Sequence, residues 1–216
     1  MTPVPDPLVF ALPKGRLVRA VTPLFRRAGI DLSVLDEAGR RLRFELPTGD
    51  TVLLVKPADV PTYVDRGVAH VGVAGLDTLL EADRDLYEPL DLGVGRCRMV
   101  VAEPAGTPRD LRRGMDLRVA TKYPRIARAH YLRRGIHPDV IELAGSVELG
   151  AVVGLADQIV DLVESGSTLR ENGLREVETV LHVSARLVVG PAALKLRSDR
   201  ISRLVDALAA AEVAHA

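Results

Sequence analysis

The stretch Gln158-Ile-Val-Asp-Leu-Val-Glu-Ser-Gly-Ser-Thr-Leu169 places an apolar run directly before a short loop rich in hydroxyl groups. A short apolar run that ends in turn-forming residues is typical of a buried strand. Residues 168–172 fit one helical turn, and Gly173 would end it. The stretch therefore predicts a strand, a loop and a helix N-terminus in succession, which is the repeating unit of α/β folds.

Residues 165–169, which we call the serine loop, have the composition of an anion-binding site. Backbone N–H groups converge at a helix N-terminus, the helix dipole favours negative charge there, and serine and threonine hydroxyls add donors. The nearby carboxylates of Asp161 and Glu164 would repel a bare anion, but they suit a sugar hydroxyl or a metal ion carried by the ligand. A phosphorylated ribose meets both demands. The alternative is that Ser and Thr only cap the helix, and spacing alone leaves both open.

Apolar runs of strand length alternate with helical periodicity over most of the chain. Strands are expected at residues 8–12, 41–46, 51–56, 70–75, 86–94, 96–102, 117–121, 140–143, 176–183 and 186–189. Helices are expected at residues 17–29, 57–67, 76–81, 126–135, 146–154 and 197–213, with another start at Thr107. Pro23 should kink the first helix or mark a second start capped by Thr22. This alternation predicts an α/β fold with largely parallel sheets.

The two halves of the chain share a design in which a strand, a basic loop and a helix follow one another. The basic loops are Lys14-Gly15-Arg16 and Lys122-Tyr123-Pro124. We predict two lobes, residues 1–94 with 184–216 and residues 95–183, with a ligand site in the cleft between them. A single sheet of many strands is the alternative on length alone.

Composition excludes several classes of function. The chain has 216 residues, 47% of them hydrophobic, and its 29 basic and 29 acidic side chains leave no formal net charge. This balance gives no electrostatic footprint for nucleic acid or a membrane surface. A lone cysteine, Cys97, allows no intrachain disulfide, and no Cys/His cluster has the spacing of a zinc site. We expect a cytoplasmic protein without an export signal.

Several segments in register resemble one enzyme family. They are Leu12-Pro-Lys-Gly-Arg-Leu17, Val60-Pro-Thr-Tyr-Val64, Arg118-Val-Ala-Thr-Lys-Tyr-Pro124, Ala144-Gly-Ser-Val-Glu148 and Gly154-Leu-Ala-Asp-Gln-Ile-Val-Asp-Leu-Val-Glu-Ser-Gly-Ser-Thr-Leu-Arg170. Together they resemble ATP phosphoribosyltransferase, and residues 142–174 are the most specific part. The length of the chain resembles the family's short form, which lacks a C-terminal regulatory domain.

The resemblance implies a fold, a reaction and partners. The fold would have two lobes like those of type II periplasmic binding proteins, with the active site in the inter-lobe cleft. The reaction would join N1 of the ATP adenine to C1 of phosphoribosyl pyrophosphate and release pyrophosphate. Mg²⁺ would accompany the substrates, and a regulatory subunit related to histidyl-tRNA synthetase would form a hetero-oligomer with this chain.

The resemblance also implies roles for individual residues. Phosphoribosyl pyrophosphate would be bound by Asp161, Glu164, Ser165, Gly166, Ser167, Thr168 and Leu169. ATP would be bound by Lys14, Gly15, Arg16, Asp91, Arg98 and Tyr123. Lys14 and Arg16 would act on the reaction electrostatically, because a ring nitrogen is already a nucleophile and needs no activated side chain.

Some positions carry open interpretations. Tyr123 could stack on adenine or pack in a core, and Glu142 and Glu148 could be acids of the site or solvated caps. His70 and Leu76 depart from the family pattern, in which an aspartate and a polar residue are usual, so a site role for either is in doubt.

Two other functions compete with this interpretation. One is a non-catalytic binding protein of the same two-lobed fold that captures a phosphorylated small molecule. The other is a phosphoribosyltransferase that uses a different base. The paired acids beside the serine loop and the missing export signal argue against the first, and substitution of other bases for ATP tests the second.

Overall fold

The computed structural model describes residues 6–36, 39–106 and 117–213. The chain forms two compact units, which are Met1–Gly95 with Ser184–Ala216 (unit 1) and Arg96–Val183 (unit 2). The division falls one residue from the predicted boundary, because Gly95 lies in unit 1. Each unit has its own sheet, so the single-sheet alternative is wrong.

Unit 1 contains a six-stranded sheet in the order β2-β3-β1-β4-β11-β5. Its strands are β1 (Val9–Pro13), β2 (Arg43–Glu45), β3 (Thr51–Val55), β4 (Val71–Gly75), β5 (Tyr87–Asp91) and β11 (Ala185–Val189). Its helices are α1 (Arg16–Arg27), η1 (Ser33–Leu35), η2 (Pro57–Asp59), α2 (Val60–Asp65), α3 (Leu76–Ala82), α7 (Pro191–Leu196) and α8 (Ser198–Val213).

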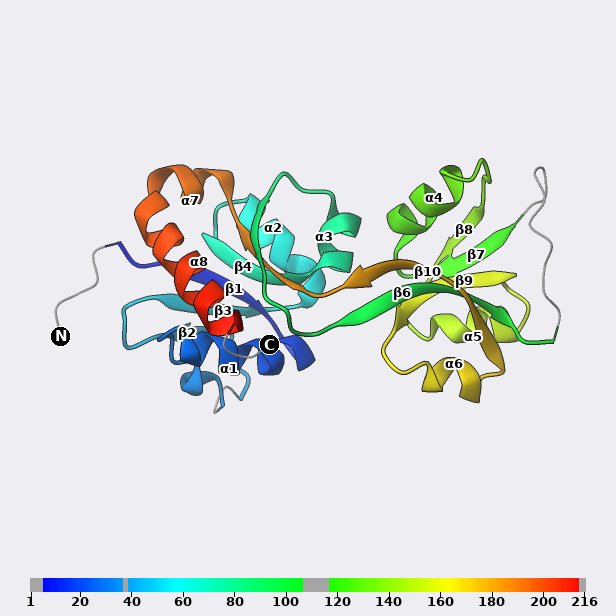
Figure 1. The fold of residues 1–216 in the computed structure, drawn as a ribbon, viewed down its shortest axis with the longest axis horizontal. Coiled ribbons are helices and arrows are strands. Elements are labelled where there is room, and N and C mark those ends of the chain that lie inside the picture. Colours follow the sequence, from blue (N-terminus) through cyan, green and yellow to red (C-terminus); the bar gives the residue numbers. More distant parts are fainter. Residues whose placement is uncertain (1–5, 37–38, 107–116, 214–216) are drawn as a thin grey trace. The chain divides into compact units, whose positions relative to one another are not determined.

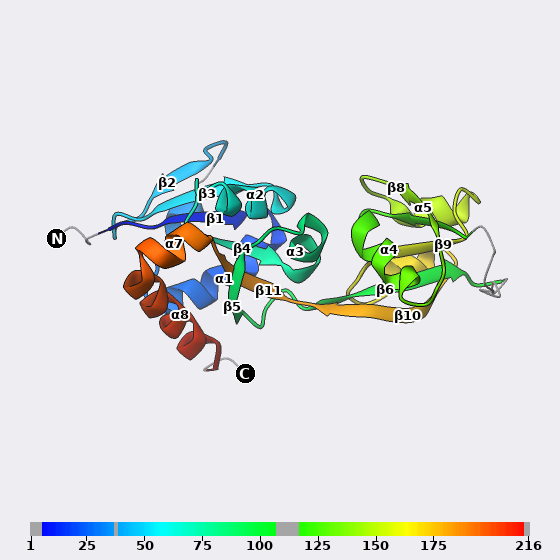
Figure 2. The ribbon, with the colours of Figure 1, turned by 90° about the horizontal axis from the view of Figure 1, so that it is seen from above.

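Helices cover both faces of the unit 1 sheet (Figures 1 and 2). Side chains alternate along β1, so Phe10 and Leu12 pack with α1 and α8, whereas Ala11 packs with α2 and α3. A strand buried on both faces is continuously apolar, as residues 8–12 are. The core therefore holds β1 in the middle of the sheet, and the loop that contains Lys14 follows the carboxyl end of this strand.

Unit 2 contains a five-stranded sheet in the order β10-β6-β9-β7-β8. Its strands are β6 (Cys97–Pro104), β7 (Arg118–Thr121), β8 (Asp139–Glu142), β9 (Gln158–Val163) and β10 (Leu174–Val183). Its helices α5 (Val147–Val152) and α6 (Ser167–Glu171) cover one face, and α4 (Pro124–Leu132) covers the other (Figure 1).

The α/β class is confirmed, but the sheets are mixed rather than largely parallel. Strand β1 is parallel to β3 and β4, and β7 is parallel to β8 and β9, whereas the other pairings are antiparallel. A tight connection such as the one from β2 to β3 permits only antiparallel pairing. Strand β6 carries the chain into unit 2 and β10 carries it out. The two strands are neighbours in one sheet and are antiparallel.

Three local expectations also need correction or comment. Helix α1 continues through Pro23, and the Thr22 hydroxyl donates to the Val18 carbonyl at 2.8 Å, so Thr22 does not cap a second helix. The chain forms α7 before α8, a helix that periodicity did not predict. The expected helix start at Thr107 lies outside the described residues. No helix within the described ranges is both long and apolar enough to cross a bilayer.

Candidate functional site

Strand β9 delivers the serine loop to one end of the unit 2 sheet. Its neighbour β7 is parallel to it, with Thr121 opposite Val160, so the chain segments that leave both strands emerge at the same edge. The Thr121 hydroxyl donates to the Val160 carbonyl at 2.7 Å and ties the two strand ends together. Carboxyl ends of parallel strands are where α/β proteins place ligands.

Asp161 is a half-buried carboxylate on β9, just before the serine loop. Burial raises its pKa to about 6, the backbone N–H of Leu162 opposes this by donating to Oδ1 at 2.8 Å, and the charge of Glu148 raises it further. The charge of Lys122 acts in the opposite direction. Retention of a carboxyl group in surroundings that penalise its charge is a mark of functional sites.

The serine loop is built from local hydrogen bonds. The Ser165 and Ser167 hydroxyl oxygens lie 3.1 Å apart, and the Ser167 N–H donates to Ser165 Oγ at 3.4 Å. Gly166 has a φ of 73°, a conformation that L side chains rarely adopt, and it precedes the first residue of α6. The first N–H groups of a helix have no partner within the helix, so α6 presents donors to this loop.

Glu176 and Arg170 lie next to Gly166, and Arg98 is paired with Glu176. A Cβ atom on Gly166 would lie 2.9 Å from Oε1 of Glu176 and 3.1 Å from Nη1 of Arg170. Arg170 Nη1 donates to the Ser165 carbonyl at 3.1 Å, and Arg98 Nη2 donates to the same Oε1 of Glu176 at 2.7 Å. Arg98, which we assigned to ATP, therefore lies beside the serine loop in unit 2.

Lys14, Gly15 and Arg16 are exposed at the carboxyl end of β1 in unit 1, where α1 begins. The Lys14 N–H donates to the Val55 carbonyl at 2.8 Å, which fixes the loop to the end of the parallel strand β3. Gly15 has a φ of 92° and open space where a Cβ would stand. The first turn of α1 contains no acidic residue, so cations and helix N–H groups face the same region without a carboxylate from that turn.

Asp91 and Tyr123, both predicted to bind ATP, make contacts within their own units. The Asp91 carboxylate accepts from the Gly93 N–H and the Ser184 hydroxyl, both at 2.9 Å, and pairs with Arg186 at 3.2 Å. The Tyr123 side chain is buried in the apolar core beneath α4. Both residues thus have contacts within the fold, and their roles in binding ATP stay predictions.

His70, which stands where an aspartate is expected, accepts a hydrogen bond from the backbone. Its Nδ1 accepts the Val9 N–H at 2.9 Å, a bond that a carboxylate oxygen could also accept, and burial lowers the pKa of the imidazole. Leu76 begins α3, and its N–H donates to the Ser184 carbonyl at 3.1 Å. The His70 side chain therefore has a structural contact, whereas the Leu76 bond uses the backbone alone.

Three residues of the unit 2 site were not assigned from the sequence. Lys122 follows β7 and affects the pKa of Asp161, whereas Arg170 and Glu176 flank Gly166. Lys122 could have been found from its place in a basic loop after a strand. The pairing of β7 with β9 brings this loop close enough to Asp161 for the charge of Lys122 to act on its pKa. Nothing in the local sequence marks Glu176, because its position depends on how β10 returns.

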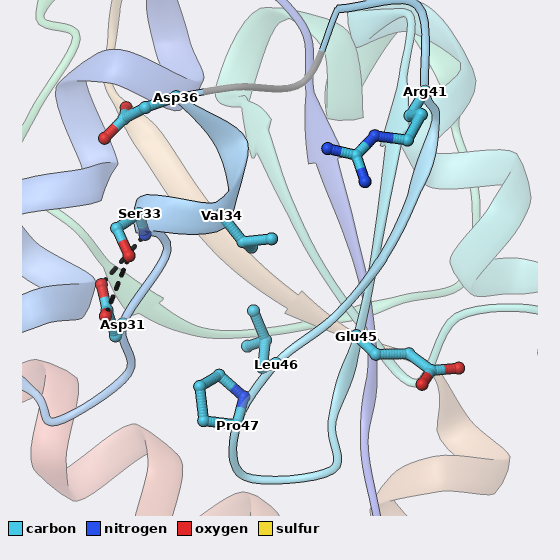
Figure 3. Close-up of a pocket in the computed structure, with 8 residues that line it drawn as sticks. All are labelled: Asp31, Ser33, Val34, Asp36, Arg41, Glu45, Leu46 and Pro47. Atoms are coloured by element: carbon cyan, nitrogen blue, oxygen red, sulfur yellow. Dashed lines mark hydrogen bonds between the residues drawn. The ribbon is translucent and has the colours of Figure 1, made fainter.

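An open pocket of about 660 Å³ in unit 1 contains none of the assigned site residues (Figure 3). It is lined by Asp31, Ser33, Val34, Asp36, Arg41, Glu45, Leu46 and Pro47. Asp31 is already engaged by the Ser33 N–H and hydroxyl, and these bonds lower the pKa of its carboxyl.

Comparisons with known proteins agree with one another. The family model for ATP phosphoribosyltransferase matches residues 56–210. The chain is 53% identical to the ATP phosphoribosyltransferase of Sorangium cellulosum over 209 residues, covering 95% of this chain and 96% of the relative. It is 49% identical to that of Cupriavidus metallidurans, covering 97% and 96%.

Solved structures give the same result. An ATP phosphoribosyl transferase (HisG:HisZ) complex from Thermotoga maritima contains a chain that superposes with a TM-score of 0.82 at 32% identity, covering 95% of this chain and 98% of that one. A substrate-binding protein of an amino acid ABC transporter superposes with a TM-score of 0.58 at 10% identity, covering 95% and 91%, and shares the fold alone. On the strength of the family model and of relatives matched over nearly their full length, the chain belongs to the ATP phosphoribosyltransferase family.

Proposed function

We propose that this chain transfers the 5-phosphoribosyl group of phosphoribosyl pyrophosphate to N1 of the ATP adenine and releases pyrophosphate, the first step of histidine biosynthesis. Family membership supports the reaction. The observation that carries the assignment of the donor site is the juxtaposition of a hydroxyl-rich helix N-terminus with a half-buried carboxylate, Asp161. A phosphate and a ribose hydroxyl on one molecule need both groups.

The serine loop would hold the 5-phosphate. The N–H groups that begin α6 and the hydroxyls of Ser165, Ser167 and Thr168 are donors, and Ser167 and Thr168 lie exposed. Leu169 is buried beneath them and anchors α6 to the core of unit 2. The loop therefore presents exposed hydrogen-bond donors from a backbone that the buried Leu169 holds in place.

Asp161 would accept hydrogen bonds from the ribose hydroxyls. Its carboxyl oxygen and that of Glu148 are also hard ligands of the kind Mg²⁺ takes alongside substrate phosphates. The charge of Glu148 raises the pKa of Asp161, so a cation carried by the donor would be favoured where the two acids act on each other. When bound, Mg²⁺ would neutralise charge on the pyrophosphate, and Glu164, which follows β9, is a further carboxylate at this edge.

Lys14 and Arg16 would act on the ATP phosphates and on the departing pyrophosphate. Positive charge develops at C1 of the ribose as the leaving group departs, so the protein contributes mainly by aligning two polyanions and neutralising the leaving one. The open space at Gly15 lets a phosphate approach the backbone where α1 begins. The nucleophile is the adenine ring nitrogen, which needs no covalent help from the chain.

We further propose that a regulatory subunit related to histidyl-tRNA synthetase assembles with this chain. The relative from Thermotoga maritima was solved as a HisG:HisZ complex, and its chain matches this one over 95% of the length. A cytoplasmic location suits a biosynthetic enzyme of this family.

Turnover distinguishes this function from the binding-protein alternative. The purified chain is mixed with ATP, phosphoribosyl pyrophosphate and Mg²⁺, alone and with the co-purified partner, and product absorbance and pyrophosphate release are followed. We expect both signals, and we expect neither when other purine or pyrimidine nucleotides replace ATP. Tight binding of the donor without turnover, even with the partner present, would instead favour a binding protein.

A further inference from the structure

We propose that Arg98 binds the phosphate of the ligand held by the serine loop. Before the ligand binds, Arg98 is paired with Glu176, and the phosphate replaces Glu176 as the partner of Arg98. The inference rests on the proposed function and deepens it. It moves Arg98 from the ATP group to the phosphoribosyl donor, and it gives a role to Glu176, which sequence reasoning did not single out.

Strand register places Arg98 at the loop. Arg98 on β6 lies opposite Val163, the last residue of β9, so its backbone stands beside the point where the serine loop begins. Its side chain reaches Glu176 on the other neighbour of β6, with Nη2 to Oε1 at 2.7 Å. The same Oε1 lies 2.9 Å from the position of a Cβ on Gly166. The ion pair therefore rests against the middle of the loop.

Gly166 suits this position through its backbone conformation, and the ends of two charged side chains lie next to it. A side chain at this position would meet both Glu176 and Arg170 Nη1, whose distance to a Cβ would be 3.1 Å. Arg170 is itself held by the Ser165 carbonyl. Glu176 and Arg170 thus lie at Gly166 itself, and Arg98 joins them through its ion pair with Glu176, so the formal charges of the three groups sum to plus one.

The charges favour exchange once a phosphate binds. A phosphate beside Gly166 would be repelled by the Glu176 carboxylate and attracted by Arg98. The Arg98 and Glu176 side chains are 33% and 29% exposed, so solvent screens the pair and little free energy is lost when it opens. A guanidinium can instead make two parallel bonds to phosphate oxygens, which is a stronger and more specific contact.

A second ion pair of unit 2 shows the contrast. Arg175 Nη2 lies 2.6 Å from Glu103 Oε1, and the Glu103 side chain is only 3% exposed. Glu103 also accepts from Gln158 Nε2 at 2.8 Å, so it belongs to a buried network. Opening that pair would leave a buried charge without a partner, which makes it structural. The pair of Arg98 with Glu176 has no such constraint.

Isothermal titration of phosphoribosyl pyrophosphate with Mg²⁺ into the full chain tests the proposal. We expect Arg98→Met to raise the dissociation constant about tenfold or more, since a bond between charged groups is lost. Arg98→Lys should recover part of the affinity, because the charge remains while the fork is lost. Glu176→Gln should lower the dissociation constant several-fold. Glu178→Gln, on the same strand but paired with Arg134, is the matched control and should change little.

Each outcome decides something. Weaker donor binding by Glu176→Gln would show that Glu176 orients Arg98 for the ligand, and it would overturn the exchange. Unchanged donor affinity in Arg98→Met, with raised ATP dissociation instead, would return Arg98 to the ATP group. In both cases the wild-type chain still binds the donor and turns over. Failure of the proposed function would appear separately, as absent donor binding or turnover in the wild type. Thermal unfolding confirms that each variant is folded.

Discussion

Replacement of Asp161 by Asn should stabilise the fold while it removes donor binding. The pKa of the carboxyl is 3.8 in its ordinary state and about 6 in the fold. A raised pKa means that the folded state holds the proton more tightly than the unfolded state, so stability falls as pH rises from about 4 to about 6 and is level above that. A difference of about two in pKa corresponds to about 3 kcal/mol. Since Asp161 is partly exposed, we expect Asp161→Asn to gain about 1–3 kcal/mol near neutral pH.

The geometry makes this substitution a clean one. Asparagine keeps the Oδ1 that accepts the Leu162 N–H, so the hydrogen bond survives while the charge is removed. The free energy of unfolding is measured by urea denaturation at about pH 8 and about pH 5. The gain should be largest at the higher pH and fall to roughly half at the lower, where the wild-type carboxyl is already protonated in the fold. Asp139→Asn, at an exposed position of β8, is the control.

Two results would contradict a charge penalty at Asp161. If Asp161→Asn is no more stable than the wild type at about pH 8, the carboxylate does not oppose folding. If a gain exists but does not vary with pH, its origin is packing and not charge. The variant should also lose affinity for phosphoribosyl pyrophosphate. A carboxylate that destabilises the fold is usually retained because it binds a ligand or takes part in a reaction.

The other predictions concern unit 1. Lys14→Met should lower kcat/KM for ATP on the order of a hundredfold, because a charge near the phosphates is lost. Arg19→Met, at an exposed position further along α1, is the control and should leave kcat/KM unchanged. Equal effects of the two substitutions would remove Lys14 from the site. Gly15→Ala should cost about 1–2 kcal/mol in unfolding experiments, since its φ of 92° strains any L side chain, and an unchanged midpoint would contradict that conformation. His70→Leu should lower the free energy of unfolding by about 1–3 kcal/mol, because the Val9 N–H loses its acceptor. His70→Asp should recover most of that free energy. An unchanged free energy of unfolding in His70→Leu would show that this bond is dispensable.

Local pattern was enough for the strand, loop and helix around residues 158–173. Each of these elements is determined by neighbours in sequence, namely the apolar run of β9, the small residues of the serine loop and the helix stop at Gly173. The exposed cations at the start of α1 could be predicted in the same way. The structure therefore confirms the local elements that carry the two candidate loops, and anion binding by these loops stays a prediction.

Pairing between distant strands could not be read from the same pattern. The place of Arg98 beside the serine loop depends on β6 lying next to β9, and that of Lys122 depends on β7 lying on the other side. The antiparallel return of β10, which brings Glu176 to Gly166, likewise rests on contacts between residues far apart in the chain. Periodicity reports burial of a face, and it contains no information about which strand lies alongside.

We expect the serine loop to bind the phosphoribosyl donor. The most direct test is calorimetric titration of phosphoribosyl pyrophosphate with Mg²⁺ into the wild type, Thr168→Val and Thr179→Val, since both threonines are exposed in unit 2 but only Thr168 lies in the loop. We predict that Thr168→Val raises the dissociation constant about five- to tenfold, as expected for loss of a hydrogen bond to a charged group, and that Thr179→Val leaves it unchanged. Equal affinity for the wild type and Thr168→Val would contradict the claim.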